Sequence, residues 1–383
     1  MKARFVFTLC LLCAACAALS SCTANGGAIY ATIETEKLVT TNTLPLTLTI
    51  EDIVKTAPNH YYVAAGGIFY GDTSTDPVTW NPNVNSPIAD RPYNPPDGLC
   101  NALAYYGGTL WGGFFTTGSN LGLYKAIVQA DGTYSFENST AETDSTIAGK
   151  QVVLLQPLNG HLFMVSASLP AGSASYAYEV DYLSSSTSAW TVLIAGLTSA
   201  VTGLAWDGTH YWMTTGSTVY EDASDPPSFA SGTSTLSSGS YSLSGIKGIY
   251  ADSIEGGRVF IATTAGGIYY SPDAGLTWEQ AKADVISSVT IGYLTVAGPV
   301  DAANNTYLVG SDGYGYYTLS LSSNPPTLTR YSDSTIALYT ESIGTILVDG
   351  TTVFMGTNSE GLWSTTFDPS TGAISTSSAW THE

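Results

Sequence analysis

The chain has 383 residues and a formal net charge of −20, with 11 Lys and Arg residues against 31 Asp and Glu residues. This balance excludes sequence-independent nucleic-acid binding, which needs a basic face, and an anionic membrane surface would repel the chain. The hydrophobic content of 44%, with 11% aromatic residues, suffices to bury a large core and excludes disorder.

The N-terminus carries the pattern of a targeting segment. Lys2 and Arg4 precede an apolar run over residues 5–18, which has the length of a signal h-region and is too short to span a bilayer. The sequence Leu19-Ser20-Ser21-Cys22 follows and resembles the bacterial lipobox, whose cysteine is acylated and becomes the mature N-terminus. We therefore expect a lipid anchor on Cys22. The alternative is an ordinary secretory signal in which this cysteine has no role.

Cysteine usage is consistent with this interpretation. Cys10, Cys13 and Cys16 lie in the signal segment, and acylation would consume Cys22. Only Cys100 is left, so no internal disulfide is expected in the mature chain. It stands at the start of an apolar run, which favours a buried, inert thiol.

A pattern of about 48 residues recurs seven times along the rest of the chain. Each copy has a tight turn followed by a strand that begins near an aromatic or aliphatic pair. Asn-Gly, Asp-Gly and Gly-Gly dipeptides supply the positive φ angles of β-hairpin turns, so each unit should contain a hairpin. The first residues of these second strands are spaced 49, 52, 49, 48, 48 and 46 apart: His60, Thr109, His161, His210, Arg258, Thr306 and Thr352.

Two further strands follow in each unit, and one precedes the turn. The third usually follows a glycine, and the fourth often opens on tryptophan. Four antiparallel strands in each of seven units, without helical periodicity, predict an all-β fold: a seven-bladed β-propeller of four-stranded blades. The tryptophans concerned are Trp80, Trp190, Trp278 and Trp380.

The domain organisation follows from these signals. We expect a lipoprotein signal peptide over residues 1–21, a lipid-anchored segment over 22–45, and the propeller over 46–383. Within the second segment, Gly27-Ala28-Ile29-Tyr30-Ala31-Thr32 echoes the third-strand pattern. It either adds outer strands that close the ring or belongs to an incomplete eighth blade, so an eight-bladed ring is the alternative.

The fifth unit contains the most specific motif. Ser271-Pro272-Asp273-Ala274-Gly275-Leu276-Thr277-Trp278 resembles in full the Asp-box, or BNR, repeat S-x-D-x-G-x-T-W of sialidases and related propellers. In that family the motif marks the turn between the third and fourth strands of a blade. We expect Asp273 to accept backbone N–H bonds, Gly275 to supply a permissive φ, and Trp278 to pack between sheets. With Ser271 and Thr277, these residues are interpreted as structural.

An enzymatic function has weaker support. The resemblance to sialidases implies an arginine triad, but Arg91, Arg258 and Arg330 fall at three different radial positions of the predicted ring. A hydrolase of neutral glycans needs only two carboxylates at a suitable distance. So acidic a chain always offers such a pair, which makes the signal uninformative. The histidines of the second strands occupy equivalent positions in different blades, so we expect solvated turn residues and no metal site. No motif for a cofactor is present.

The longest insertion is the most distinctive candidate for a binding loop. It runs from Asn81 to Gly98, contains five prolines, and carries Arg91 and Tyr93. Stiff loops lose little entropy on binding, and tyrosine and arginine are typical contact residues; a cover over a blade edge is the alternative. We interpret the chain as a noncatalytic propeller that binds a protein or a glycan. The lipobox and the Ser/Thr/Tyr-rich units are similar to envelope lipoproteins of spirochaetes and related bacteria. Thr23 lacks the Asp that retains lipoproteins at the inner membrane in some bacteria, which favours an outer-membrane location.

Overall fold

The structure is a computed structural model that describes residues 48–383 apart from 75–77, 83–98, 117–118, 137–141, 171, 237–240, 255–256, 265, 282–289, 332–336 and 375–379. The described residues belong to one compact unit, Thr43–Glu383. The signal peptide, Cys22, the segment Gly27–Thr32, Arg91 and Tyr93 lie outside the described residues.

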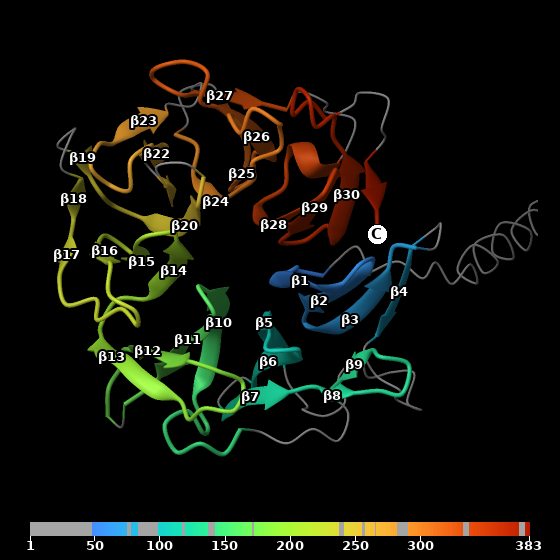
Figure 1. Ribbon diagram of the computed structural model, residues 1–383, viewed down its shortest axis with the longest axis vertical. Coiled ribbons are helices and arrows are strands. Elements are labelled where there is room, and N and C mark those ends of the chain that lie inside the picture. Colours follow the sequence, from blue (N-terminus) through green and yellow to red (C-terminus); the bar gives the residue numbers. More distant parts are fainter. Residues whose placement is uncertain are drawn as a thin grey trace, which may run out of the picture. The chain divides into compact units, whose positions relative to one another are not determined.

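Seven antiparallel sheets follow one another around a common axis (Figure 1), so the fold is the predicted seven-bladed β-propeller. The first strand of each blade contacts the first strands of its neighbours, and these contacts continue around the full ring. The first strands are β1 (Asp52–Ala57), β5 (Leu99–Tyr106), β10 (Gln151–Leu158), β14 (Val201–Trp206), β20 (Ile246–Asp252), β24 (Tyr293–Ala297) and β28 (Ile343–Asp349).

The second strands begin where the repeat predicts, within one residue. They are β2 (His60–Ala65), β6 (Thr109–Thr116), β11 (His161–Ser168), β15 (Tyr211–Thr215), β21 (Arg258–Thr263), β25 (Thr306–Ser311) and β29 (Thr352–Thr357). The preceding turns have the positive φ angles that their composition predicts, as at Asn159 (45°) and Gly160 (78°).

The third and fourth strands complete the blades. The third strands are β3 (Gly67–Asp72), β7 (Ser119–Lys125), β12 (Ala177–Leu183), β16 (Val219–Asp222), β22 (Ile268–Ser271), β26 (Tyr316–Ser320) and β30 (Leu362–Thr366). The fourth strands are β4 (Thr79–Pro82), β13 (Thr191–Leu197), β17 (Gly232–Thr233), β23 (Glu279–Ala281), β27 (Thr327–Arg330) and β31 (Thr381–His382). A short hairpin, β18 (Thr235–Leu236) and β19 (Tyr241–Ser242), and a 3-10 helix, η1 (Ala337–Tyr339), lie in connections between blades.

Blade 2 departs from the predicted four strands. Its described sheet has three, β5, β6 and β7, and the chain then forms a separate hairpin of β8 (Ile127–Val128) and β9 (Tyr134–Ser135). The physical reason is a local turn: Asp131 accepts hydrogen bonds from the backbone N–H and the hydroxyl of Thr133, and Gly132 has a φ of 85°. This turn folds the chain back on itself, so the residues from Ile127 to Ser135 form a hairpin of their own.

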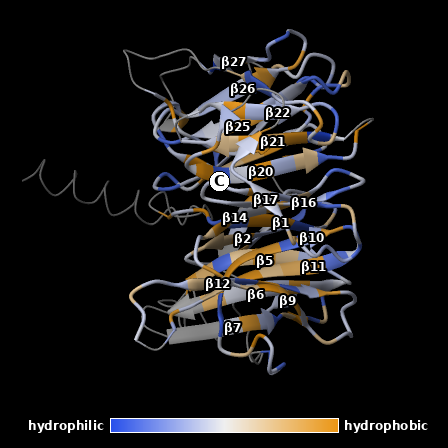
Figure 2. Ribbon diagram, turned by 90° about the vertical axis from the view of Figure 1, so that its left-hand side faces the viewer, coloured by the Kyte–Doolittle hydropathy of each residue, from blue (hydrophilic) through white to orange (hydrophobic). Residues whose placement is uncertain are grey.

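The core consists of seven apolar clusters, one at each interface between neighbouring blades. Because each sheet is covered on both faces, its second strand is buried almost throughout, as in β2, where Tyr61 packs toward blade 7 and Tyr62 toward blade 2. Figure 2 shows hydrophobic residues along the strands and hydrophilic ones mainly in the loops. Cys100 is a buried free thiol, as expected.

The ring closes between blade 7 and blade 1. The backbone N–H of Ile50 donates to the carbonyl of Thr357 at 2.9 Å, and Lys55 forms an ion pair with Asp349 at 2.6 Å. At the periphery, the indole Nε1 of Trp80 donates to the Glu383 carboxylate at 3.0 Å, and Ser364 donates to the same carboxylate. Both Trp80 and Glu383 are buried. Side-chain contacts therefore hold the two described ends of the propeller together.

Replacing Glu383 tests this closure. Glu383→Ala leaves the buried Trp80 indole without its acceptor, so we expect the free energy of unfolding to fall by about 1–3 kcal/mol. Glu383→Gln keeps a carbonyl oxygen for the indole and should restore most of the loss. Urea unfolding of both variants measures the difference. An unchanged midpoint for Glu383→Ala would show that this contact does not hold the ring closed.

Candidate functional site at the hairpin end of the ring

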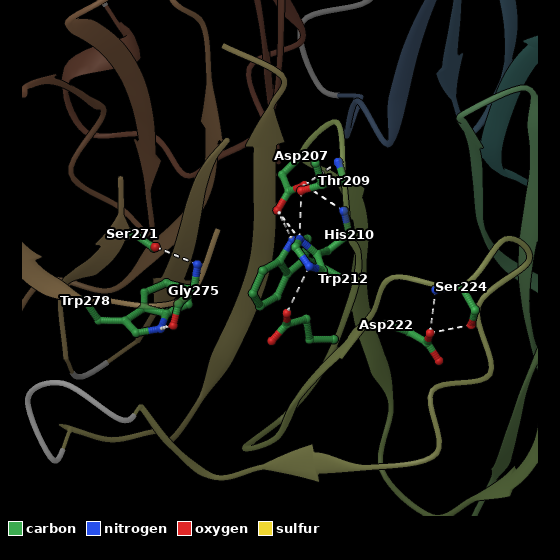
Figure 3. A network of polar contacts seen from close by, with 10 residues as sticks. Asp207, Thr209, His210, Trp212, Asp222, Ser224, Ser271, Gly275 and Trp278 are labelled. Atoms are coloured by element: carbon green, nitrogen blue, oxygen red, sulfur yellow. Dashed lines mark hydrogen bonds and ion pairs between the residues drawn. The ribbon is translucent and has the colours of Figure 1, made fainter. Parts of the chain in front are cut away.

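The loops of a propeller lie at two ends of the ring. We call one the hairpin end; it holds the loops between first and second strands and between third and fourth strands of each blade. The linker end holds the loops between second and third strands and the connections between blades. The Ser271–Trp278 segment and the turn dipeptides of the repeat all lie at the hairpin end, where Figure 3 shows the polar contacts of blades 4 and 5.

The Ser271–Trp278 turn is held by its own side chains. The Oδ1 of Asp273 accepts the backbone N–H of Thr277 and its Oδ2 accepts the Thr277 hydroxyl, both at 2.7 Å. The Ser271 hydroxyl accepts the N–H of Gly275 at 2.7 Å, and the Trp278 indole donates to the Gly275 carbonyl at 3.0 Å. Burial alone would raise the pKa of Asp273, but the hydrogen bonds from Thr277 and Ser271 outweigh it and hold the pKa below its ordinary value.

This turn packs against the neighbouring blade. Trp278 meets Trp212 of blade 4 edge to face, with ring centroids 6.1 Å apart. Gly275 has a φ of 85°, and a Cβ there would lie 2.4 Å from the Trp212 ring. The position therefore requires glycine twice over, for its backbone conformation and for the close approach. The turn joins blades 4 and 5 in addition to shaping the loop.

Asp207 organises the hairpin turn beside it in blade 4. Its carboxylate accepts the backbone N–H groups of Thr209 and His210 at 2.8 and 2.7 Å, the Thr209 hydroxyl at 2.8 Å, and the buried Trp212 indole at 2.8 Å (Figure 3). Burial would raise the pKa of Asp207, yet these donors together lower it. Sequence reasoning recognised only the turn dipeptide here. An aspartate followed two residues later by threonine is the signal that would have indicated the acceptor.

The fourth-blade loop after β16 uses the same device. Asp222 accepts the backbone N–H and hydroxyl groups of both Ser224 and Ser228, and also the N–H of Phe229. Burial opposes ionisation, but the two serines together hold the pKa of Asp222 well below its ordinary value. Phe229 is buried in the interface between blades 3 and 4. Asp222, one of the acids at this end, is thus committed to turn structure.

The histidines differ from the expected solvated turn residues. His161 Nε2 lies 2.8 Å from Asp225 of the next blade, and its side chain is 16% exposed. Tyr211 donates to the same carboxylate at 2.8 Å and accepts from Asn159 at 2.9 Å. His210 lies between two acids, 3.5 Å from Asp207 and 3.6 Å from Glu221. The acidic partner of His161 comes from the loop after β16 in the next blade, whereas those of His210 come from the turn before β15 and from β16 of its own blade.

Two of the three arginines considered for a triad lie at opposite ends of the ring. Arg258 opens β21 at the hairpin end and donates to the Tyr307 hydroxyl at 3.0 Å. Arg330 closes β27 opposite Tyr317 at the linker end, where it donates to the carbonyls of Tyr314 and Tyr339 at 3.0 and 2.6 Å. These two guanidinium groups therefore cannot converge on one carboxylate.

The pKa values of the hairpin-end aspartates depend on how many hydrogen bonds each carboxylate accepts. A glycosidase acid needs a raised pKa, whereas the pKa values of Asp207, Asp222 and Asp273 are lowered. At the same end of the ring, burial raises the pKa of Asp252, whose carboxylate accepts the Tyr307 hydroxyl at 2.6 Å. Burial raises the pKa of Asp181 to about 8, but this side chain is fully buried between blades 2 and 3. Burial raises the pKa of Asp52 to about 7. The Asp52 carboxylate accepts the backbone N–H groups of Ile53 and Leu103.

Within the described part of the chain, no group of three or more His, Cys, Asp or Glu side chains is arranged to hold a metal ion. The same residues include no helix with the length and apolar character needed to cross a membrane.

The Trp278 contact yields a test of the structural role. Trp278→Ala removes a buried aromatic side chain, so the free energy of unfolding should fall by about 3–5 kcal/mol, while ligand affinity of the folded fraction stays the same. Leu276 in the same turn is 77% exposed, and Leu276→Ala serves as the matched control with little effect. Unchanged stability together with lost binding would identify the turn as a ligand site instead.

No protein-family model and no curated protein sequence matches this chain. Its structure is similar to that titled YCF48 bound to D1 peptide, with a TM-score of 0.56, 15% identity, and coverage of 85% of this chain and 94% of that one. YCF48 from Cyanidioschyzon merolae gives a TM-score of 0.55 at 15% identity, covering 84% and 96%. The WD40 β-propeller domain of Doa1 gives 0.54 at 12% identity, covering 84% and 93%. At such identities, these similarities show the propeller fold.

Proposed function

We propose that this chain is a noncatalytic β-propeller that acts as a binding platform for a protein or a glycan on the bacterial cell envelope. The observation that carries the proposal is the construction of the ring: seven filled interfaces fix the blades, and side-chain hydrogen bonds fix hairpin-end turns such as those at Asp207 and Asp273. A fixed scaffold with varied loops is suited to presenting contact residues. The neighbour that carries a D1 peptide supports a protein ligand by analogy of fold.

The envelope location rests on the N-terminal sequence. Leu19-Ser20-Ser21-Cys22 supports acylation of Cys22, and Thr23 lacks the acidic character that retains some lipoproteins at the inner membrane, which favours the outer membrane. The lipobox and the Ser/Thr/Tyr-rich propeller units support an origin among spirochaetes or related bacteria.

A sialidase-like or other glycoside hydrolase is the alternative function. The Ser271–Trp278 segment favours it, because the motif it resembles occurs in sialidases. The separation of Arg258 from Arg330 and the lowered pKa values of Asp207 and Asp273 count against it. We therefore favour binding over hydrolysis.

The lipid anchor has a direct test. Cys22→Ala removes the acylation site, and the variant should leave the detergent phase in Triton X-114 partitioning or retain its signal segment, because acylation supplies the membrane affinity. Cys100→Ala is the matched control, since that thiol is buried in the propeller. If Cys22→Ala partitions like the natural chain, the lipobox interpretation is wrong.

The binding function predicts saturable binding to an envelope glycan or protein and no turnover of sialyl or aryl glycosides. Arg91→Ala combined with Tyr93→Ala should weaken that binding by at least about 1 kcal/mol if the proline-rich loop makes the contact. Calorimetric titration and a chromogenic hydrolysis assay measure the two properties. Hydrolysis abolished by one Asp or Glu substitution would establish the enzyme instead, whereas unchanged binding in the double variant would place the contact elsewhere on the ring.

A further inference from the structure

A row of aromatic rings joins blade 1 to blade 2 at the hairpin end. His60 contacts Tyr70 edge to face, with centroids 5.5 Å apart, and Tyr70 lies 5.2 Å from Tyr62. Tyr62 meets Tyr134 of the β8–β9 hairpin at 6.0 Å, and Tyr134 meets Tyr105 at 5.7 Å. We call these five residues the tyrosine ridge. It is built from strands β2, β3, β5 and β9, so it spans two blades and the hairpin between them.

The rings of the ridge are held in place by hydrogen bonds, and three of them are partly accessible to solvent. Tyr62 is 1% exposed, and its hydroxyl accepts the backbone N–H of Tyr134 at 2.7 Å. The Tyr134 hydroxyl donates to the Gly108 carbonyl at 3.0 Å. The side chains of Tyr70, Tyr105 and Tyr134 are half-buried, so parts of their rings face solvent. These contacts give the rings fixed positions before any ligand arrives.

Two carboxylates from different parts of the chain converge on the ridge. Asp72 ends β3 in blade 1, and Asp131 lies in the exposed turn of the β8–β9 hairpin. Burial, followed by the charges of both aspartates, raises the pKa of Tyr70. Asp72 is paired directly with His60 across β2 and β3, and Asp131 lies in the turn that joins Val128 to Tyr134. Their convergence makes this part of an already acidic protein a favourable place for a cation.

An exposed apolar edge continues the ridge. Val128 is paired directly with Tyr134 across the hairpin, so its side chain lies on the same face as the Tyr134 ring, and it is 57% exposed. Aromatic rings, two carboxylates and the aliphatic side chain of Val128 thus lie close together. An arginine side chain matches this combination, because its planar guanidinium stacks on aromatic rings while it pairs with carboxylates.

We propose that the tyrosine ridge, with Asp72, Asp131 and Val128, is a docking surface for an extended peptide segment in which arginine alternates with apolar residues. The occupant follows from charge complementarity, since the converging carboxylates add little to recognition of a neutral sugar and much to recognition of a cation. The inference rests on the proposed binding function and adds a second surface to it. The proline-rich loop is at the other end of the ring: Pro82 near its start and Leu99 directly after it both lie at the linker end, opposite the ridge.

The probe is a fluorescein-labelled ten-residue peptide of alternating arginine and valine, titrated into the full chain in detergent and followed by fluorescence anisotropy. The comparison peptide has glutamine in place of arginine. We expect the arginine peptide to bind at least tenfold more tightly than the glutamine peptide. Binding should also weaken as salt is raised, because exposed charges are screened.

Variants locate the binding on the ridge. Asp131→Asn combined with Asp72→Asn, and separately Tyr70→Ala, should each raise the Kd at least tenfold, while Tyr70→Phe keeps it within about twofold. Asp368→Asn is the matched control, because Asp368 is also an exposed hairpin-end aspartate that accepts the N–H and hydroxyl of a residue two positions on. It should leave the Kd unchanged. Asp131→Asn alone alters an exposed side chain, so it remains decisive if Tyr70→Ala fails to fold.

Several results would overturn the proposal. Equal binding of the arginine and glutamine peptides, or an unchanged Kd in the double Asp→Asn variant, would show that the ridge does not recognise the cation. An equal loss in Asp368→Asn would reduce the effect to the overall charge of the protein. Displacement of the peptide by a neutral oligosaccharide would make the ridge a glycan site. The proposed function fails separately, if the chain hydrolyses glycosides or binds no envelope component.

Discussion

The seam between blades 7 and 1 is the contact on which the rest of this structure depends. Every blade buries both faces of its sheet, so none has a complete core until its two neighbours are in place. Six of the seven interfaces form between segments that follow each other along the chain. The seventh joins segments about 300 residues apart through Trp80, Phe354 and Glu383. The loss of chain entropy on closing so long a loop is offset only when the apolar faces meet.

A second device recurs around the ring and ties neighbouring blades at the hairpin end. A polar residue near the first turn of one blade meets a tyrosine on the second strand of the next: Asp349 with Tyr61, Asp252 with Tyr307, and Asn159 with Tyr211. Each tyrosine buries its ring in the interface and directs its hydroxyl to the loop end. The hairpin end is therefore cross-linked by polar contacts above an apolar core, which fixes the relative positions of loops on adjacent blades.

The sequence predicted what repeats within a unit and missed what arises between units. Blade number, the start of the second strands and the turn dipeptides follow from local pattern, because positive φ angles and strand periodicity are properties of a few adjacent residues. The His161–Asp225 pair joins residues 64 apart that belong to different blades, and the tyrosine ridge combines β2, β3, β5 and β9. The repeat along the sequence gives no information about such contacts between residues of different blades. Among its described residues blade 2 has three strands and a separate hairpin, which the turn at Asp131 forms.

The seam also determines how the ring responds to mechanical load. Among the described residues, blade 1 is built from 52–82 and blade 7 from 343–382, so neither sheet borrows a strand from the other end. Opening the ring at this point separates blade 1 from blade 7 and leaves the strand pairing within each of these blades intact. Thr49 and Ile50 hold the chain to Asn358 and Thr357 at the seam itself. A pull on the chain ahead of Leu48 is consequently borne first by these contacts, before it reaches the hydrogen bonds of any blade.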